Sequence, residues 1–219
     1  MTVGSRAPRV AVVDYGAGNL VSIEQALTAA GADVHRAVTA AQIDEPDLLV
    51  VPGVGAAAPA MERLRDGGFV EPIRAWVAAD RPFLGICLGL QLLFEGSDED
   101  GAVTLGILPG RTVRLEGAPT LPHIGWNQVE RRRQHPSFAG IAPAADFYFV
   151  HSYVGAPAGP GSDEVILAET EHGSRFVSAV ARGRLLGVQF HPERSGSNGL
   201  RLVANVVALA AATTTGSPA

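Results

Sequence analysis

One cysteine lies in a pattern suited to nucleophilic chemistry. Cys87 is the only cysteine of the 219 residues, and residues 85–89 read G-I-C-L-G between an apolar run and a helical pattern. The glycines remove Cβ atoms where a strand and a helix come close, and a helix N-terminus favours a thiolate. An isolated cysteine is most often a buried structural residue. The turn context instead favours an exposed nucleophile, with the backbone N–H of Leu88 facing an oxyanion.

A cysteine nucleophile needs a base, and the base needs a group that orients it. His191 follows the apolar run 185–190 directly and is followed by Pro192 and Glu193. Proline ends the strand, and the glutamate can turn back to hold the imidazole in one tautomer. H-P-E alone is a weak signal, but together with Cys87 it completes a Cys–His–Glu triad.

The other five histidines are weaker candidates for the base. They lie near strand ends, in a turn or before a proline: His35, His123, His135, His151 and His172. We keep His123 and His151 as supporting residues, because a purely structural explanation fits these two less easily.

The loop 51–55, V-P-G-V-G, supports the same chemistry. Two glycines around one small residue let backbone N–H groups approach an anion. In a doubly wound sheet this loop would lie at the carboxyl ends of the strands, beside Cys87. By spacing alone an ordinary turn explains it better, and it is neither a dinucleotide-binding nor a Walker motif.

Apolar periodicity predicts the elements that must position these residues. A helix is expected between Asn19, as N-cap, and Gly31, as C-cap. The other expected elements of the first half are strands at 9–13, 33–36, 47–51 and 82–86, and helices at 59–65, 69–79 and 88–94. This alternation predicts a parallel sheet with helices on both faces.

The second half is strand-rich, and turns separate its strands, which favours antiparallel hairpins. The expected strands are 112–115, 124–130, 147–150, 165–170, 176–180 and 185–190; a helix at 200–210 follows, and 155–161 reads as a surface loop. The sequence therefore predicts a three-layer α/β fold with a mixed, mostly parallel sheet. We expect one domain, 1–219, with an ordered core at 9–210 and loose ends at 1–7 and 213–219.

Composition narrows the function classes. Hydrophobic residues make up 47% and charged residues 18%, which excludes a disordered chain. The formal charge is 17 − 22 = −5, which argues against nucleic-acid and anionic-membrane partners. No apolar stretch approaches the roughly 20 residues of a membrane span, and we identify no signal peptide. A single cysteine fits a cytoplasmic, reducing compartment; we expect no metal and no cofactor.

Three motifs together, P-G-V-G, G-I-C-L-G-L-Q and V-Q-F-H-P-E, resemble the class I (triad) glutamine amidotransferases. Members of that family hydrolyse the side-chain amide of glutamine to glutamate and ammonia through a cysteinyl thioester. The segments 14–20 (D-Y-G-A-G-N-L), 122–127 (P-H-I-G-W-N) and 148–153 (Y-F-V-H-S-Y) are similar to the glutaminase subunits of imidazole glycerol phosphate synthase in histidine biosynthesis. The resemblance covers about residues 9–210.

The resemblance implies a role for each matching position. Cys87 would be the nucleophile, His191 the general base and then acid, and Glu193 its orienter. The remaining positions are Val54 and Leu88 for the oxyanion hole; Gly55, Gln91, Ser152 and Tyr153 for the glutamine pocket; and Asn19, Trp126, Tyr148 and Arg194 for the face that docks on a partner.

The implied partner is a cyclase subunit of the (β/α)₈ barrel type, which would form a heterodimer with this chain. It would use the ammonia to make imidazole glycerol phosphate and aminoimidazole carboxamide ribonucleotide, so poor activity is expected from this chain alone. Two departures affect the expected contacts. Residues 56–58 are alanines where members often have Phe, and Arg194 replaces a common Lys, keeping its charge but not its geometry.

Three alternatives stay open from the residues. The chain could supply ammonia in another amidotransferase pathway, although the segments 14–20 and 122–127 argue against that. It could be a different cysteine hydrolase, such as an esterase-like enzyme, which usually takes its acid from a separate loop. A regulatory protein with a dead site is disfavoured, because all three triad residues are present.

Two charged segments are expected to be solvated rather than functional. Residues 131–133, R-R-R, read as a hairpin tip between two strands. Residues 97–101 form an acidic loop, for which a metal site is the less favoured interpretation.

Overall fold

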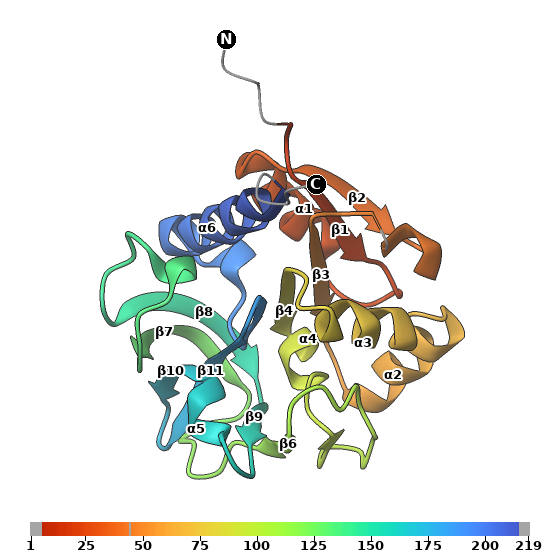
Figure 1. Cartoon of the computed structure of the whole chain (residues 1–219). Coiled ribbons are helices and arrows are strands. Elements are labelled where there is room, and N and C mark those ends of the chain that lie inside the picture. The colour runs from red at the N-terminus through yellow and green to blue at the C-terminus, as the bar shows by residue number, and fades with distance from the viewer. Residues whose placement is uncertain (1–5, 44, 215–219) are drawn as a thin grey trace.

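The computed structural model describes residues 6–43 and 45–214. Within this part of the chain the main strands are β1 (Arg9–Val13), β2 (Asp33–Ala37), β3 (Leu48–Gly53), β4 (Phe83–Cys87), β7 (His123–Arg131), β8 (Ala145–His151), β10 (Ile166–Glu171), β11 (Arg175–Arg182) and β12 (Leu185–Val188). They form a nine-stranded sheet in the order β2-β1-β3-β4-β12-β11-β10-β7-β8 (Figure 1).

The sheet has a parallel half and an antiparallel half. β2, β1, β3, β4 and β12 run parallel, whereas β11, β10, β7 and β8 pair antiparallel with their neighbours. Gly53 pairs with Cys87 across β3 and β4, and Val188 pairs with Ile86 across β12 and β4. The chain segments that follow β3, β4 and β12 therefore meet at one edge, where the sequence predicts the site.

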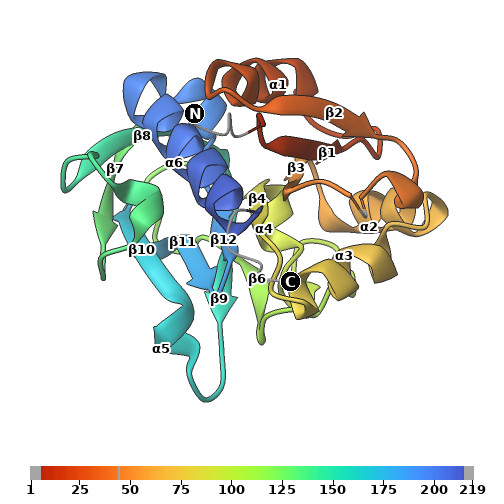
Figure 2. The same ribbon diagram turned by 45° about the horizontal axis from the view of Figure 1, so that its top comes forward.

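Helices cover both faces of the parallel half. α1 (Leu20–Ala29) and α6 (Gly196–Thr214) lie side by side on one face (Figure 2), and α2 (Ala57–Asp66), α3 (Val70–Ala78) and α4 (Leu88–Gln91) pack on the other. Val10 and Val12 of β1 belong to the first core, and Ala11 and Val13 to the second, as the alternation of side chains along a strand requires. The predicted three-layer α/β fold is confirmed. Among the described residues no helix is long and apolar enough to cross a membrane.

A small second sheet corrects one prediction. It consists of β5 (Gly96–Ser97), β6 (Gly110–Arg114) and β9 (Tyr153–Pro157), and the short α5 (Ser162–Val165) follows it. The segment 155–161, expected to be a loop, thus begins as strand. Gly155 is needed there because a Cβ atom would collide with the ring of Phe94. Its glycine serves close packing rather than a turn.

Two element ends beside the expected site also differ. The helix expected at 88–94 stops at Gln91, and the strand expected at 185–190 stops at Val188, so His191 does not follow β12 directly. The remaining short helices are η1 (Ala40–Ile43), η2 (Pro136–Phe138) and η3 (Pro192–Arg194). Of the ends predicted to be loose, 1–7 and 213–219, residues 1–5 and 215–219 lie outside the described residues. Arg6 forms an ion pair with Asp47 (2.7 Å), and 213–214 belong to α6. The single-domain organisation stays a prediction.

Candidate active site

A cleft of about 460 Å³ lies at the carboxyl ends of the parallel strands, and Cys87 is in its wall. All six residues that the sequence assigns to the oxyanion hole and the glutamine pocket meet there: Val54, Gly55, Leu88, Gln91, Ser152 and Tyr153. Leu88 and Gln91 belong to α4 and Tyr153 to β9, whereas the other three lie in the loops that follow β3 and β8. The structure therefore brings together residues separated by up to a hundred positions in the sequence.

The backbone at Cys87 has the geometry of a sharp turn. Its φ of 53° and ψ of −108° are strained for a residue with a side chain. A Cβ atom on Gly85 would lie 2.7 Å from the carbonyl oxygen of Gly89, and one on Gly89 would collide with the carbonyl oxygen of Val51. Both glycines of G-x-C-x-G are thus required for the strand and helix to approach.

His191 and Glu193 form a buried pair. His191 Nδ1 and Glu193 Oε1 are 2.8 Å apart, and the two side chains are 6% and 2% exposed. The His191 amide N–H donates to the carbonyl of Tyr148 (2.8 Å), and Ser195 Oγ donates to the carbonyl of His191 (2.6 Å). These contacts fix the turn that follows β12, so the imidazole has one orientation.

The electrostatics couple His191 to the cysteine. Burial alone would lower the pKa of His191, but its interactions with Cys87 and with Glu193 outweigh burial and raise that pKa to about 10. His191 Nε2 has no hydrogen-bond partner among the described side chains and backbone groups. The ring nitrogen that is not engaged by Glu193 is therefore available for proton transfer.

The loop after β3 is held by a residue for which sequence reasoning assigned no role. Tyr15 Oη donates to the carbonyl oxygen of Pro52 over 2.7 Å, and burial raises the pKa of Tyr15. A Cβ atom on Gly53 would collide with the Tyr15 hydroxyl, so glycine is required between Pro52 and Val54. The loop is anchored at Pro52, while Val54 is 48% exposed at the edge of the cleft.

A carboxylate in the cleft was also missed. Glu99 lines the cleft, and burial together with the neighbouring Asp100 raises its pKa. Asp100 accepts a hydrogen bond from the backbone N–H of Ala58 (2.6 Å), in the first turn of α2. The acidic segment 97–101 therefore contributes to the cleft rather than being only a solvated loop. Within the described ranges no cluster of His, Cys, Asp and Glu could hold a metal ion.

The residues expected at a docking face form a surface beside the cleft. The guanidinium of Arg194 lies 4.3 Å from the ring centre of Tyr148, and the rings of Tyr148 and Trp126 are 6.1 Å apart. Trp126 is 57% exposed. Asn19 and Arg194 line a small cavity that also contains His191. The four positions thus lie on the side of the molecule that carries His191 and Glu193.

The arginine segment 131–133 does not form a hairpin tip. Arg131 is the last residue of β7, and its side chain donates to the carbonyl of Phe138 (3.4 Å). Arg132 forms ion pairs with Asp163 and Glu169, and Arg133 donates to the carbonyl of Ala181. These cations are engaged in structural contacts.

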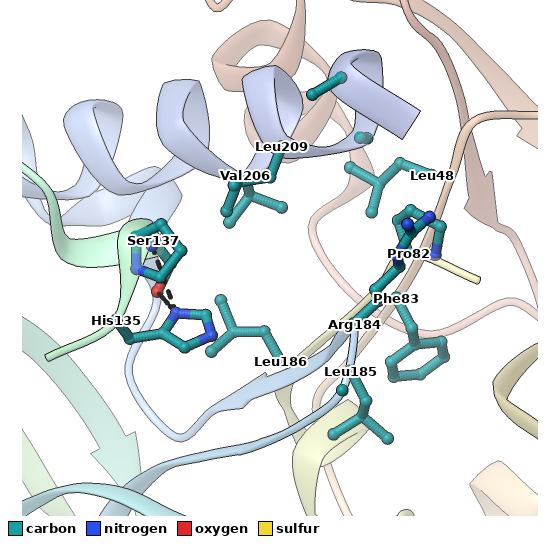
Figure 3. Close-up of a pocket in the computed structure, with 14 residues that line it drawn as sticks. Leu48, Pro82, Phe83, His135, Ser137, Arg184, Leu185, Leu186, Val206 and Leu209 are labelled. Carbon is teal, nitrogen blue, oxygen red and sulfur yellow. Dashed lines mark hydrogen bonds between the residues drawn. The ribbon is translucent and has the colours of Figure 1, made fainter. Parts of the chain in front are cut away.

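A second cavity, of about 300 Å³, has a different character (Figure 3). It lies between α6 and the amino ends of β3, β4 and β12, and Leu48, Leu186 and Val206 line it. His135 is the only histidine among the described residues of its wall, and it is hydrogen-bonded to Ser137 (2.7 Å). Neither Cys87 nor His191 is among the described residues that line this cavity.

Comparison with known proteins defines the class. Residues 11–208 match the family Glutamine amidotransferase class-I. PurLQS from Thermotoga maritima shares the fold, with a TM-score of 0.73 and 17% identity over 93% of this chain and 99% of that chain.

Sequence relatives give the narrower family. The imidazole glycerol phosphate synthase subunit HisH of Synechococcus sp. (strain JA-3-3Ab) is 47% identical over 92% of this chain and 94% of its own length. The subunit HisH of Dehalococcoides mccartyi (strain ATCC BAA-2266 / KCTC 15142 / 195) is 44% identical over 92% of this chain and 97% of its own length. This chain belongs to the class-I glutamine amidotransferases and, within them, to the HisH subunits of imidazole glycerol phosphate synthase.

Proposed function

We propose that Cys87, His191 and Glu193 hydrolyse glutamine to glutamate and ammonia, and that this chain delivers the ammonia to a cyclase subunit. The observation that carries the proposal is the strained Cys87 in the wall of the cleft, electrostatically coupled to the buried His191–Glu193 pair. The side-chain amide of glutamine is the bond that a cysteine nucleophile with a histidine base would cleave.

The reaction has two steps. The Cys87 thiolate attacks the amide carbon, the C–N bond breaks, and His191 gives its proton to the departing ammonia. A water then attacks the thioester while His191 removes a water proton, and the C–S bond breaks to release glutamate. Backbone N–H groups of Val54 and Leu88 would stabilise the oxyanion in both steps.

The polar residues of the cleft fit the rest of the glutamine molecule. Glu99 has the charge to pair with the α-ammonium group, since it is a carboxylate in the cleft wall. Gly55, Gln91, Ser152 and Tyr153 would contact the remaining polar atoms of the substrate.

Ammonia set free in water at neutral pH is protonated and is no longer a nucleophile, so direct transfer is advantageous. The partner we propose is a cyclase subunit of the (β/α)₈ barrel type that docks on Asn19, Trp126, Tyr148 and Arg194 as a heterodimer. It would convert the ammonia and its nucleotide substrate to imidazole glycerol phosphate and aminoimidazole carboxamide ribonucleotide. A cytoplasmic location suits a nucleophilic thiol, which must stay reduced.

The test is glutamate release from glutamine by the chain alone and by its complex with the cyclase and its nucleotide substrate. Strong release in the complex only, absent in Cys87→Ala, is the expected result. Glutamate release that does not depend on the cyclase would support a role in another ammonia-donating pathway instead. No release under any condition would overturn the proposal.

A further inference from the structure

The sulfur of Cys87 has a neighbour that the triad does not use. Gln189 is fully buried, and its Nε2 lies 3.6 Å from Cys87 Sγ, within the range of a sulfur hydrogen bond. We propose that Gln189 donates this N–H to the Cys87 thiolate and so stabilises and positions the nucleophile, and that a buried chain of hydrogen bonds keeps its amide in that orientation. The inference rests on the proposed glutaminase function of the same site.

The orientation of the Gln189 amide follows from Gln91. Gln91 Nε2 donates to the carbonyl oxygen of Tyr153 (2.8 Å) and to Gln189 Oε1 (3.1 Å). A backbone carbonyl only accepts hydrogen bonds, so turning the Gln91 amide over would place oxygen against oxygen. With Gln91 fixed as the donor, Gln189 must present Oε1 to it, and Gln189 Nε2 then faces the sulfur.

Two histidines hold the other side of the same carbonyl. His151 Nδ1 lies 3.1 Å from the Tyr153 oxygen and must carry the proton, because the carbonyl cannot donate. Neutral His151 then accepts at Nε2 from His123 Nδ1 (3.2 Å), and His123 accepts at Nε2 from Asn127 Nδ2 (3.3 Å). With one tautomer of each ring, every hydrogen bond from Asn127 through the two histidines to the Tyr153 carbonyl has a donor and an acceptor.

Both rings are neutral at neutral pH. Burial, followed by the neighbouring His123, lowers the pKa of His151 to about 3. Burial, followed by the neighbouring His172, lowers the pKa of His123 to about 4. A second proton on His151 would point at the donor nitrogen of His123. The arrangement that orients Gln189 is therefore the stable one at the pH of the reaction.

The contribution to catalysis concerns the charge of the sulfur. As a thiol, Cys87 can donate its S–H to the carbonyl of Val150, 4.0 Å away. As a thiolate it needs donors, and α4, which begins at Leu88, is only one turn long, so its dipole is weak. Gln189 supplies an N–H from the buried side, and a donor to the charged form favours that form.

The test combines two variants and a matched control. Gln189→Glu keeps the shape and an acceptor for Gln91 but places oxygen against the sulfur, whereas Gln189→Met removes the amide. Ser178→Ala is the control, because Ser178 is equally buried on the adjacent β11 and its hydroxyl has no partner among the described residues. The readouts are the rate of Cys87 alkylation by iodoacetamide against pH, on the chain alone, and kcat and KM for glutamine in the cyclase complex.

In both Gln189 variants we expect alkylation at pH 7 to slow by about tenfold or more, with its rise displaced to higher pH, because a hydrogen bond to a charged group is lost. We expect kcat to fall by a similar factor with KM within about twofold, and Ser178→Ala to match the wild type.

A Gln189→Met variant that alkylates like the wild type across the pH range, with unchanged kcat, would overturn the inference. If Gln189→Met does not fold, Gln189→Leu, which also lacks the amide, takes its place. A wild type that releases no glutamate while the alkylation shift is present would refute the proposed function and leave the role of Gln189 supported.

Discussion

The two ends of the parallel strands differ in composition and in strain. At the carboxyl ends, β4 finishes on Cys87 with a positive φ, and polar side chains line the cleft. At the amino ends, Leu48, Phe83 and Leu185 are the first residues of β3, β4 and β12, and they line an apolar cavity under α6 (Figure 3). One end carries the strained cysteine and a polar cleft, and the other carries buried hydrocarbon.

This difference shows how the fold tolerates a strained nucleophile. A residue with the backbone angles of Cys87 costs about 1–3 kcal/mol and persists only where its surroundings determine it. Hydrophobic burial along the same strands contributes about 25 cal/mol per Å² and offsets that cost. Changes at the carboxyl end should therefore alter activity, and changes at the amino end should alter stability.

The largest effect is expected at Cys87. Cys87→Ala and Cys87→Gly should both lower kcat by about 10⁴-fold or more, because the nucleophile is gone. Cys87→Gly should nevertheless be more stable than Cys87→Ala by about 1 kcal/mol, since glycine adopts this backbone without strain. Urea unfolding and glutamate release in the cyclase complex measure the two quantities.

A helical alanine serves as the control for that stability difference. Ala75 is exposed within α3, so Ala75→Gly should destabilise the chain by about 1 kcal/mol. If Cys87→Gly were instead less stable than Cys87→Ala, the turn would not be strained and the comparison between the two ends would fail.

The next effect concerns Glu193. Glu193→Gln should lower kcat roughly 100-fold or more, because the orientation and the charge of His191 both depend on the carboxylate. The folded chain holds a proton on His191, whose pKa of about 10 exceeds the ordinary 6.5. Because the folded state binds this proton more tightly than the unfolded state, the proton stabilises the fold. The stabilisation is complete below pH 6.5 and is lost as the pH rises through 10.

The free energy of unfolding of the wild type should therefore fall between pH 6.5 and 10, and fall less in Glu193→Gln. Urea titrations at several pH values measure both slopes. Glu71→Gln removes an exposed partner of Arg74 and should leave the slope unchanged. Equal slopes for the wild type and Glu193→Gln would contradict the raised pKa.

At the amino end, Leu48→Ala should destabilise the chain by about 2–5 kcal/mol, because it enlarges an existing cavity from a fully buried position. The kcat of the folded protein should stay within about twofold of the wild type. Val21→Ala, at a position 54% exposed, should change stability by less than about 0.5 kcal/mol. A tenfold loss of kcat in Leu48→Ala would show that the two ends are not independent.

Sequence reasoning worked best where a pattern is local. The strand at 9–13 is observed as β1 with the same bounds, and the expected turn at Cys87 has the positive φ that such a turn needs. Buried parallel strands are continuous apolar runs, and glycines around a nucleophile are a short-range signal. These features therefore needed no knowledge of tertiary contacts.

The ends of α4 and β12 were predicted wrongly because residues buried by tertiary contacts extend the apolar pattern past the end of each element. Leu92, Leu93 and Phe94 are all buried beyond the end of α4, and Phe190 is buried beyond the end of β12. Apolar residues there looked like continued helix and strand, although the backbone already turns. The contact between Gln91 and Gln189 joins residues 98 positions apart, and no spacing rule predicts such a pair.

The smallest effect is expected at Tyr15, where the anchored loop after β3 meets the cleft. Tyr15→Phe removes the hydrogen bond to the carbonyl of Pro52, which should cost about 1 kcal/mol of stability. It should also lower kcat about threefold to tenfold, because Pro52 immediately precedes the Gly53–Val54 peptide that we expect at the oxyanion, and an ångström of misplacement there weakens that contact.

Thr104→Val is the matched control for Tyr15→Phe. Thr104 Oγ1 also donates from a buried hydroxyl to a backbone carbonyl, that of Phe94 (2.6 Å), but Thr104 does not line the cleft. Both variants should lose similar stability in urea titrations, and only Tyr15→Phe should lose kcat in the cyclase complex. Equal kcat losses in the two variants would mean that the Tyr15 contact stabilises the fold without positioning the oxyanion loop. Tyr15 would then belong with the residues that affect stability, although it lies near the carboxyl ends of the strands.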